Sequence, residues 1–266
     1  MLYLFKEWKT IADKIRTASH TMLMFDFDGT LTPIVDTPEI ADLSEESRRL
    51  LKNLSRHPNF TVAIISGRAL KDLQDKVGIP EIIYAGNHGL EIQGPDLAFV
   101  HPIKEEVKPV LRIIALALKK TLGAIRGAII EDKGLTLSVH YRLVDDQEID
   151  EVKDILDSTV GVAAVLGKVR TTSGKMVYEV RPAVPWDKGK AVKLLMKRYG
   201  KGGWKSGLLP LYIGDDLTDE DAFKVIENYG GITIYVGEGN NQSAASYYLK
   251  STEEVANLIE ELLGMK

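Results

Sequence analysis

The chain has 266 residues, which is more than one average domain of about 100–200 residues and leaves room for a large core with an insertion. Its net charge of −4 argues against a nucleic-acid-binding protein, and the absence of cysteine excludes disulfides, thiol nucleophiles and thiolate metal sites. No apolar run reaches about 18 residues, and the charged N-terminus lacks the shape of a signal peptide, so we expect a cytoplasmic protein without a membrane span.

The N-terminal part of the chain is predicted to alternate helices with buried strands. Leu4, Trp8, Ile11 and Ile15 recur at helical spacing and predict an amphipathic helix over 3–18. The elements expected next are a strand at 22–26, a helix at 45–56 capped by Ser44, a strand at 61–65, a helix to about 77 and a strand at 82–85. This alternation is typical of a Rossmann-like, doubly wound parallel sheet, in which ligands bind beyond the carboxyl ends of the strands.

The pattern changes from about residue 103 onwards. The elements expected there are a helix at 104–122, strands at 128–131 and 135–142 that form a hairpin around Lys133-Gly134, a helix at 146–158, and strands near 162–171 and 175–181 joined at Ser173-Gly174. Hairpins between helices indicate a small α+β unit with an antiparallel sheet.

After Pro182 and Pro185 the alternating pattern returns. The elements expected in this last part are a helix at 187–199, a strand at 210–213, a helix at 218–228, a strand at 232–236 and a helix at 252–263. We therefore predict an α/β fold in which a core domain of residues 1–103 and 184–266 is interrupted by an inserted α+β cap domain of residues 104–183.

Asp26 and Asp28 stand at the end of the apolar run that begins at Met22, and Gly29 and Thr30 follow them. If the strand continues, both carboxylates point the same way, because strand side chains repeat every two residues. Two carboxylates on one face are hard to keep ionised without a cation between them, which suits Mg2+ and leaves one carboxylate to attack phosphorus. A turn or helix-cap cluster is the alternative interpretation, and the buried strand before the pair disfavours it.

Three more polar clusters stand where strands end or helices begin. Ser66 follows a buried strand and can hold a phosphate oxygen through its hydroxyl and the neighbouring N–H groups. Lys188 opens a helix and can supply a point charge to phosphate. Asp215, Asp216 and Asp219 follow another strand and can complete an oxygen-rich Mg2+ site. Taken alone, each cluster is more often a helix cap, a solvated side chain or an acidic helix N-terminus, but the four together indicate one phosphate-handling site.

These motifs resemble those of the haloacid dehalogenase superfamily of phosphohydrolases. The matching segments are Asp26-Phe-Asp-Gly-Thr30, Ser66, Lys188 and Gly214-Asp-Asp-Leu-Thr-Asp219. The resemblance implies that Asp26 is the nucleophile that forms an aspartyl-phosphate, and that Asp28 protonates the leaving alcohol and later activates water. It also implies that Ser66 and Lys188 orient and neutralise the phosphoryl group. The Mg2+ ligands it implies are Asp26, the backbone carbonyl of Asp28 and Asp215, with Asp216 or Asp219 in support.

A narrower resemblance, to the trehalose-6-phosphate phosphatase family, spans about residues 20–240 and includes motifs in the cap. The segments that carry it are Ile65-Ser-Gly-Arg68, Gly86-Asn-His-Gly89 with Glu91, Glu131-Asp-Lys133, His140-Tyr-Arg142, Glu179-Val-Arg-Pro182 and Gly214-Asp-Asp-Leu-Thr-Asp-Glu220. The family implies that the core cleaves phosphate while the cap grips the disaccharide. The substrate-binding residues that it implies are Arg68, Asn87, His88, Glu131, Lys133, His140, Arg142 and Glu179.

The strand expected at 135–142 supports a sugar-binding cap independently of the resemblance. One of its faces is apolar and the other is polar, the polar one carrying Thr136, Ser138, His140 and Arg142. Sugars need such a face, because many hydroxyls require both donors and acceptors. Glu131, Lys133 and Glu179 are expected on strands that can pair beside it. An ordinary solvated sheet face is the alternative.

The resemblance therefore leads us to expect a Mg2+-dependent phosphatase that hydrolyses trehalose 6-phosphate to trehalose and phosphate through an aspartyl-phosphate. We expect a monomer whose partner is a small-molecule sugar phosphate, with no nucleic acid and no membrane. The alternatives are a phosphatase for sucrose, glucosylglycerol or mannosylglycerate phosphate, a phosphomutase, and a non-catalytic sugar-phosphate sensor. Intact Asp26 and Asp28 count against the sensor, because binding alone needs no nucleophile paired with an acid.

Overall fold

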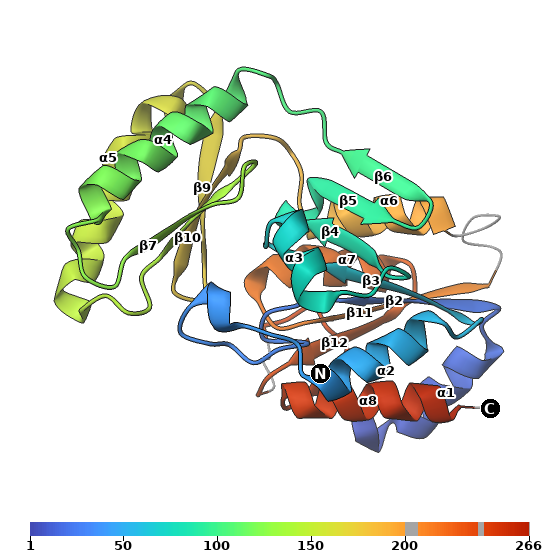
Figure 1. Ribbon diagram of the computed structural model, residues 1–266. Coiled ribbons are helices and arrows are strands. Elements are labelled where there is room, and N and C mark those ends of the chain that lie inside the picture. The colour runs from blue at the N-terminus through green and yellow to red at the C-terminus, as the bar shows by residue number, and fades with distance from the viewer. Residues whose placement is uncertain (200–206, 239–241, 266) are drawn as a thin grey trace. The chain divides into compact units, whose positions relative to one another are not determined.

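The chain folds into two compact units (Figure 1). The parts of the chain that the computed structural model describes are residues 1–199, 207–238 and 242–265. The core unit is formed by Met1–Val100 together with Trp186–Lys266, and the insert is formed by His101–Pro185. The cap expected at 104–183 falls inside this insert.

Among the described residues, the core unit contains one nine-stranded sheet. Its strands are β1 (Leu2–Tyr3), β2 (His20–Phe25), β3 (Phe60–Ile65), β4 (Ile83–Gly86), β5 (Glu91–Gly94), β6 (Leu97–Val100), β11 (Leu208–Gly214), β12 (Ile232–Val236) and β13 (Tyr247–Leu249). They run in the order β1-β13-β12-β11-β2-β3-β4-β5-β6. All neighbouring strands from β1 to β4 are parallel, whereas β5 and β6 add an antiparallel edge.

Helices cover both faces of this sheet. The α-helices are α1 (Trp8–Thr17), α2 (Glu45–Ser55), α3 (Leu70–Val77), α6 (Lys188–Tyr199), α7 (Glu220–Asn228) and α8 (Thr252–Gly264), and the short 3-10 helices are η1 (Leu4–Lys6), η2 (Pro38–Ile40), η3 (Asn87–Gly89) and η6 (Leu217–Asp219). Side chains of α1, α2, α3 and α8 join one hydrophobic cluster with the sheet, and those of α6 and α7 join a second. The predicted α/β class with a doubly wound, parallel-sheet core is confirmed.

The central strand β2 shows how its sequence fits between two helical layers. Leu23 and Phe25 belong to the first hydrophobic cluster, Met22 and Met24 belong to the second, and all four are fully buried. Because successive side chains point to opposite faces, a strand covered on both sides reads as a continuous apolar run. Asp26 follows this run and therefore stands at the carboxyl edge of the sheet, where ligands of such folds bind.

The insert is a two-layer α+β unit. Its elements are α4 (Val107–Leu122), β7 (Ile129–Asp132), β8 (Leu137–His140), η4 (Asp146–Glu148), α5 (Ile149–Val165), β9 (Val169–Gly174) and β10 (Val177–Pro182). The strands form an antiparallel sheet in the order β7-β8-β10-β9. Helices α4 and α5 lie side by side, α4 packing on β7 and α5 on β9 (Figure 1). The predicted antiparallel sheet is confirmed.

The prediction of a helix over 3–18 is wrong for the first turns of that helix. Leu2 and Tyr3 form β1, which pairs in parallel with β13 at the edge of the core sheet, and η1 precedes the true helix α1. The apolar residues of this segment recur at helical spacing, but the pairing partner lies more than 240 residues away in the chain. Local periodicity cannot reveal such a long-range partner.

The prediction starts the strand at about 162, which is too early, because β9 begins at Val169. Residues 162–165 end α5, and Val162 and Val165 are 74% and 88% exposed, which a buried strand would not allow. A short run of valine and alanine fits a strand or a helix, and extension of an existing helix costs no new nucleation. The hairpin turn also lies at Lys175 and Met176, the latter at φ 62°, rather than at Ser173-Gly174, which belong to β9.

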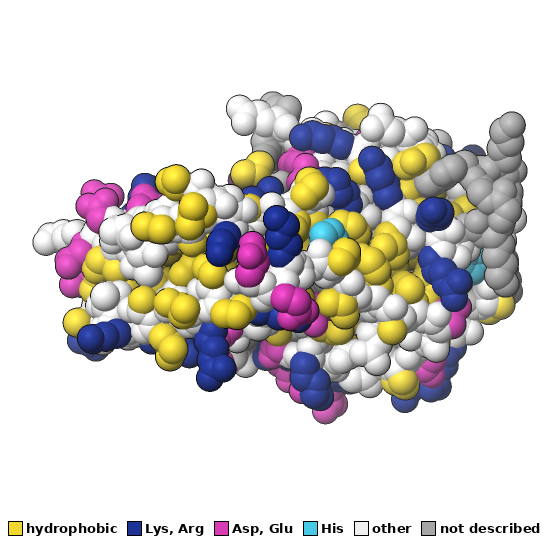
Figure 2. Space-filling model, turned by 90° about the horizontal axis from the view of Figure 1, so that it is seen from above, with side chains coloured by type: hydrophobic (Ala, Val, Ile, Leu, Met, Phe, Trp, Pro, Cys, Tyr) yellow, Lys and Arg dark blue, Asp and Glu magenta, His cyan; other side chains and the backbone are white. Residues whose placement is uncertain are grey.

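On the face that Figure 2 shows, Lys and Arg side chains are interspersed with acidic and hydrophobic ones. Exposed apolar side chains of the insert include Ile113 and Leu116 of α4. Within the described residues, no helix is both long and apolar enough to cross a membrane.

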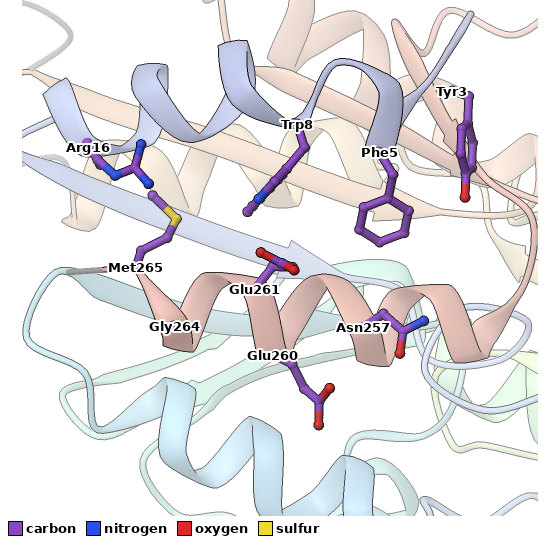
Figure 3. A pocket seen from close by; sticks show the side chains of 9 residues that line it. All are labelled: Tyr3, Phe5, Trp8, Arg16, Asn257, Glu260, Glu261, Gly264 and Met265. Carbon is purple, nitrogen blue, oxygen red and sulfur yellow. The ribbon is translucent and has the colours of Figure 1, made fainter.

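A groove of about 660 Å³ lies between the N-terminal segment and α8 in the core unit (Figure 3). Its lining residues are Tyr3, Phe5, Trp8, Arg16, Asn257, Glu260, Glu261, Gly264 and Met265. The set contains no member of the four polar clusters that the sequence assigns to phosphate chemistry. The groove is therefore separate from the candidate site.

Candidate active site

The carboxyl ends of three neighbouring strands gather the expected phosphate-handling residues at one edge of the core sheet. Asp26 follows β2, Ser66 follows β3 and Asp215 follows β11, and the sheet order places these strands side by side as β11-β2-β3. The Asp26 N–H donates to the carbonyl of Ile213 at 2.8 Å, which extends the pairing of β2 with β11 by one residue. Lys188, the first residue of α6, approaches Asp26 from that helix.

Three carboxylates form the centre of this site. One oxygen from each of Asp26, Asp215 and Asp219 lies within 4.8 Å of the other two, and all three residues are buried. We call these three residues the acidic group. Lys188 places its Nζ 3.1 Å from Asp26 Oδ1 and 2.7 Å from Asp219 Oδ1, and only 2% of its side chain is exposed. One ammonium thus faces three carboxylates in a site almost closed to water.

The pKa values of these groups reflect the crowding. Burial raises the pKa of Asp26 well above its ordinary value, Asp219 and Asp215 add to the rise, and the Lys188 ammonium opposes it. Burial by itself disfavours the charged form of Lys188, but the carboxylates of Asp219 and Asp26 outweigh it and raise the pKa of Lys188. The lysine therefore stays charged, while its charge is too small to neutralise the acidic group alone.

Gly29 lets the turn after β2 approach Asp215. Its φ of 81° lies in the left-handed region, and a Cβ placed there would lie 2.1 Å from Asp215 Oδ2, so no other residue fits without displacing that carboxylate. The next residue, Thr30, is fully buried and donates its hydroxyl to Asp215 Oδ1 at 3.2 Å. The turn that follows Asp28 therefore also positions Asp215.

Asp219 differs from the other two members of the acidic group in its hydrogen bonds. Its Oδ1 accepts from Lys188 Nζ and from the Tyr212 hydroxyl at 2.7 and 2.6 Å, and its Oδ2 accepts from the N–H groups of Asp215 and Asp216 at 3.1 and 3.0 Å. A carboxylate offers about four acceptor directions, and these four donors use them. Asp219 is thus suited to position Lys188 and the Asp215 backbone rather than to bind a metal.

Asp216 and Asp28 lie outside the acidic group. Asp216 caps η6, and its Oδ1 accepts the Leu217 N–H at 2.6 Å. The Asp28 carboxylate accepts two hydrogen bonds from Arg68, with Nε to Oδ2 at 2.8 Å and Nη2 to Oδ1 at 2.7 Å. The expected support of a metal by the Asp216 side chain therefore has no geometric basis in this arrangement.

The loops that follow β3 and β4 pack against each other, and they carry Ser66, Asn87 and His88. The Ser66 Oγ accepts the Arg68 N–H at 3.2 Å, and the Ser66 N–H donates to the Ala85 carbonyl. The Asn87 side chain donates to Glu91 Oε2 at 2.8 Å, and its backbone N–H donates to the Arg68 carbonyl at 2.7 Å. Ser66, Asn87 and His88 are all buried, and the latter two have positive φ values. These contacts favour a structural role for Asn87, whereas the family resemblance implies substrate binding.

The insert carries its own cluster of paired charges on the sheet. The register places Glu131 opposite Ser138 and Ser138 opposite Glu179, so their side chains share one face. Lys133 Nζ lies 3.2 Å from Glu179 Oε1 and 3.9 Å from Glu131 Oε2, and His140 Nε2 lies 3.0 Å from Glu131 Oε2. We call Glu131, Lys133, Ser138, His140 and Glu179 the polar cluster. It offers carboxylate, ammonium, imidazole and hydroxyl groups together.

Arg142 does not belong to the polar cluster. It donates from Nη2 to the Lys175 carbonyl at 3.0 Å, in the turn between β9 and β10. The strand β8 ends at His140, so the alternation that predicts a polar face no longer fixes the direction of Arg142.

Sequence reasoning missed three residues that hold the site together. They are Thr30, Tyr212 and Asp72. In the sequence, Thr30 is one residue of the motif that begins at Asp26 and carries no signal of its own. Tyr212 lies within the apolar run Leu211-Tyr-Ile213, where a buried tyrosine usually needs a hydrogen-bond partner. Asp72 accepts from Arg68 Nη1 at 2.8 Å, and its i, i+4 spacing from Arg68 was the available signal.

The parallel sheet with the buried acidic group at its carboxyl edge places the chain in the haloacid dehalogenase-like class of fold. A haloacid dehalogenase-like hydrolase from Bacteroides thetaiotaomicron has the same fold, with a TM-score of 0.63 over 91% of this chain and 99% of that one, at 17% identity. Within this class, the chain belongs to the trehalose-phosphatase family, whose model matches residues 24–253. The family that the sequence motifs resemble is thereby confirmed.

Similar proteins carry the same family name. The probable trehalose-phosphate phosphatase 3 of Oryza sativa subsp. japonica is 38% identical over 262 residues, which cover 92% of this chain and 70% of that protein. The solved C-terminal domain of C. albicans trehalose-6-phosphate phosphatase matches in fold, with a TM-score of 0.81 over 97% of each chain at 24% identity. Membership of a phosphatase family of this type implies a phosphoric monoester hydrolase that uses a divalent metal ion.

Proposed function

We propose that this chain hydrolyses trehalose 6-phosphate to trehalose and phosphate, with Asp26 as the nucleophile and Mg2+ as the metal. The observation that carries the proposal is the Asp26 carboxylate, which is buried at a strand end and held 3.1 Å from the Lys188 ammonium beside Asp215. This arrangement suits phosphoryl transfer, in which positioning and charge neutralisation supply most of the catalysis. Membership of the trehalose-phosphatase family and the name of the rice relative support the choice of substrate.

The charges of the site fit a divalent cation. When all three carboxyls are ionised, they leave two negative charges against one ammonium in a buried place, and a hard divalent ion with oxygen ligands would balance them. Because four donors already use the oxygens of Asp219, the side chains that would hold the ion are those of Asp26 and Asp215, with the Asp28 carbonyl as the family resemblance implies. When bound, Mg2+ supplies charge neutralisation to the phosphoryl oxygens.

The chemistry divides between the residues around the acidic group. An oxygen of Asp26 attacks phosphorus, the bond to the sugar oxygen breaks, and Asp28 donates a proton to that oxygen. Water then attacks the aspartyl-phosphate, gives its proton to Asp28 and releases phosphate, so that Asp26 is restored. Lys188 stays charged beside Asp26 and stabilises the negative charge that the phosphoryl group brings.

The polar cluster of the insert supplies the chemistry that a disaccharide needs. The Glu131 carboxylate can accept hydrogen bonds from sugar hydroxyls, and the His140 imidazole can donate to them, while Lys133, Ser138 and Glu179 hold the cluster from behind. The cluster is partly exposed at Glu131 and His140, with 24% and 20% of these side chains accessible. We therefore assign sugar recognition to the polar cluster and phosphate chemistry to the core unit.

The experiment that tests this function measures phosphate release from a panel of sugar phosphates. Trehalose 6-phosphate, sucrose 6-phosphate, glucose 6-phosphate, glucosylglycerol phosphate and mannosylglycerate phosphate are each incubated with the chain and Mg2+. We expect kcat/KM for trehalose 6-phosphate to exceed that for every other substrate by at least about tenfold, or 1.4 kcal/mol. A higher value for another ester would change the substrate, and an isomerised sugar phosphate without phosphate release would identify a mutase.

A further inference from the structure

We infer that Arg68 is a positioning residue for Asp28 rather than a substrate-binding residue. The inference rests on the proposed function, because it assumes that Asp28 is the proton donor. It is carried by the hydrogen bonds and the burial of the Arg68 guanidinium. The family resemblance, in contrast, assigns Arg68 to the substrate.

The Arg68 guanidinium has almost no donors left for a ligand. Nε and Nη2 bind the two oxygens of Asp28, Nη2 also donates to the Pro38 carbonyl at 3.0 Å, and Nη1 binds Asp72 Oδ2 at 2.8 Å. Four of the five N–H groups of an arginine are thus engaged within the protein. The side chain is 7% exposed. A substrate phosphate would have to break these bonds before it could bind Arg68.

The backbone of Arg68 is held as firmly as its side chain. Its N–H donates to Ser66 Oγ at 3.2 Å and its carbonyl accepts the Asn87 N–H at 2.7 Å. The guanidinium carbon lies 5.3 Å from the centre of the Phe27 ring, next to Asp28 in the chain. The side-chain and backbone contacts together fix the direction of the Arg68 guanidinium, which donates two hydrogen bonds to the Asp28 carboxylate.

A bidentate fork fixes the orientation of a carboxylate, not only its position. Two parallel N–H···O bonds hold the carboxylate plane in line with the guanidinium, which a single point charge cannot do. Asp28 has 36% of its side chain exposed and would otherwise be free to rotate. A proton donor must keep its reacting oxygen within hydrogen-bond reach of the leaving oxygen, so loss of this orientation slows proton donation.

The test uses three small phosphate esters that carry no sugar: ethyl, phenyl and 4-nitrophenyl phosphate. The alkoxide of ethanol is a poor leaving group and needs a proton, whereas 4-nitrophenolate leaves without one. The ratio kcat/KM reports only the steps up to departure of the alcohol, so the later role of Asp28 with water does not enter. We expect Arg68→Gln to lower kcat/KM about 10- to 100-fold for ethyl phosphate and less than about threefold for 4-nitrophenyl phosphate.

A double-mutant cycle with Asp28→Asn separates positioning from binding. If Arg68 acts through Asp28, the loss in the double variant on ethyl phosphate will equal that of Asp28→Asn alone within about threefold. Equal losses in kcat/KM for all three esters, or losses that multiply in the double variant, would overturn the inference. Arg68 would then be a residue that binds the substrate. If Asp28→Asn itself shows no dependence on the leaving group, the proposed function fails instead.

Two further variants guard the test against misfolding. Arg68→Lys keeps the charge but cannot donate two parallel hydrogen bonds to Asp28. We therefore expect it to retain the wild-type unfolding temperature within about 4 °C and to show the same selective loss on ethyl phosphate as Arg68→Gln. Full activity on ethyl phosphate in Arg68→Lys would show that charge alone suffices and would overturn the inference. Arg56→Gln, which breaks an exposed ion pair with Glu81, is the matched control and should leave all three rates unchanged.

Discussion

The acidic group of the core unit and the polar cluster of the insert both pair carboxylates with a lysine, but they balance charge differently. In the acidic group, three buried carboxylates face the single ammonium of Lys188. In the polar cluster, two carboxylates face the ammonium of Lys133 and the imidazole of His140. The acidic group therefore has two more carboxylates than ammonium groups and is buried, whereas the polar cluster has one more and is partly exposed at Glu131 and His140.

This difference indicates what each group is built to bind. An excess of buried negative charge is costly unless a cation enters, and that cation then attracts a phosphate dianion. A mixed set of donors and acceptors that water partly reaches has less need of a cation and suits a neutral, hydroxyl-rich ligand. The same residue types thus serve two chemistries. The two groups differ in the number of carboxylates for each ammonium and in their degree of burial. The predictions below test this separation.

The largest effect is expected for Asp26→Asn, which removes the nucleophile and keeps the shape of the side chain. We expect kcat for trehalose 6-phosphate to fall by more than about a thousandfold, or 4 kcal/mol, with the fold retained. Steady-state phosphate release measures kcat, and circular dichroism measures whether the fold is retained. Turnover within tenfold of the wild type would rule out the covalent route and, with it, the special role of the acidic group.

Removal of the metal should abolish activity in the same assay. A chelator should leave less than about 1% of the rate, and added Mg2+ should restore it, because Asp26 and Asp215 cannot both approach a phosphate dianion without a cation. We also expect Ca2+ to inhibit, since it is larger and takes more ligands. Full activity in a chelator without any divalent ion would contradict the proposed metal.

Variants of Asp215 and its neighbour Asp216 form a matched pair that tests which carboxylate binds the metal. We expect Asp215→Asn to raise the Mg2+ concentration needed for half-activity at least about 10- to 100-fold. Asp216→Asn should change it less than about threefold, because that carboxylate caps η6 instead of joining the acidic group. Equal shifts for both variants would place Asp216 at the metal after all.

Much of the core unit could be predicted from the sequence because its signals are local. The apolar run before Asp26 and the aspartate cluster after Ile213 each mark a strand end, and parallel strands bring their carboxyl ends to one edge. The polar face of β8 was likewise readable from strict alternation around Ser138. Positions of this kind need only the period of the strand and the rule for parallel sheets.

What could not be predicted depends on contacts between distant segments. Strand β1 exists only because β13 pairs with it, and the partners of Asp219 cannot be inferred from an acidic motif. Arg68 was assigned to a ligand because a motif cannot show that Asp28, Asp72 and Pro38 already occupy its donors. Saturation of hydrogen bonds is a property of the folded site, so it needs coordinates.

Smaller effects are expected in the polar cluster, and they should depend on the substrate. Glu131→Ala, Lys133→Ala and His140→Ala should each lower kcat/KM for trehalose 6-phosphate by one to three orders of magnitude, about 1.4–4 kcal/mol. They should hardly alter the hydrolysis of 4-nitrophenyl phosphate, which has no sugar. Lys153→Ala, which breaks an exposed ion pair with Asp157 on α5, is the control. Equal losses on both substrates for all three variants would mean that the cluster is structural.

The smallest effect is one of stability, and it tests the excess charge directly. Burial raises the pKa of Asp26 above its ordinary value of 3.8. A carboxyl whose pKa is raised in the folded state contributes stability at low pH and loses that contribution as the pH rises through its folded pKa. The metal-free wild type should therefore become less stable than Asp26→Asn towards neutral pH, by about 1 kcal/mol or about 2–4 °C in unfolding temperature.

Added Mg2+ should reverse this order, because an ion that binds only the folded wild type stabilises it by mass action. Thermal unfolding of both proteins at pH 4.5 and 7.5, with chelator and with Mg2+, gives the four comparisons. At the lower pH the metal-free difference should shrink, since more of the wild-type Asp26 is then protonated. If the metal-free wild type is the more stable protein at pH 7.5, Lys188 balances the acidic group by itself. The contrast with the polar cluster would then lie in burial alone.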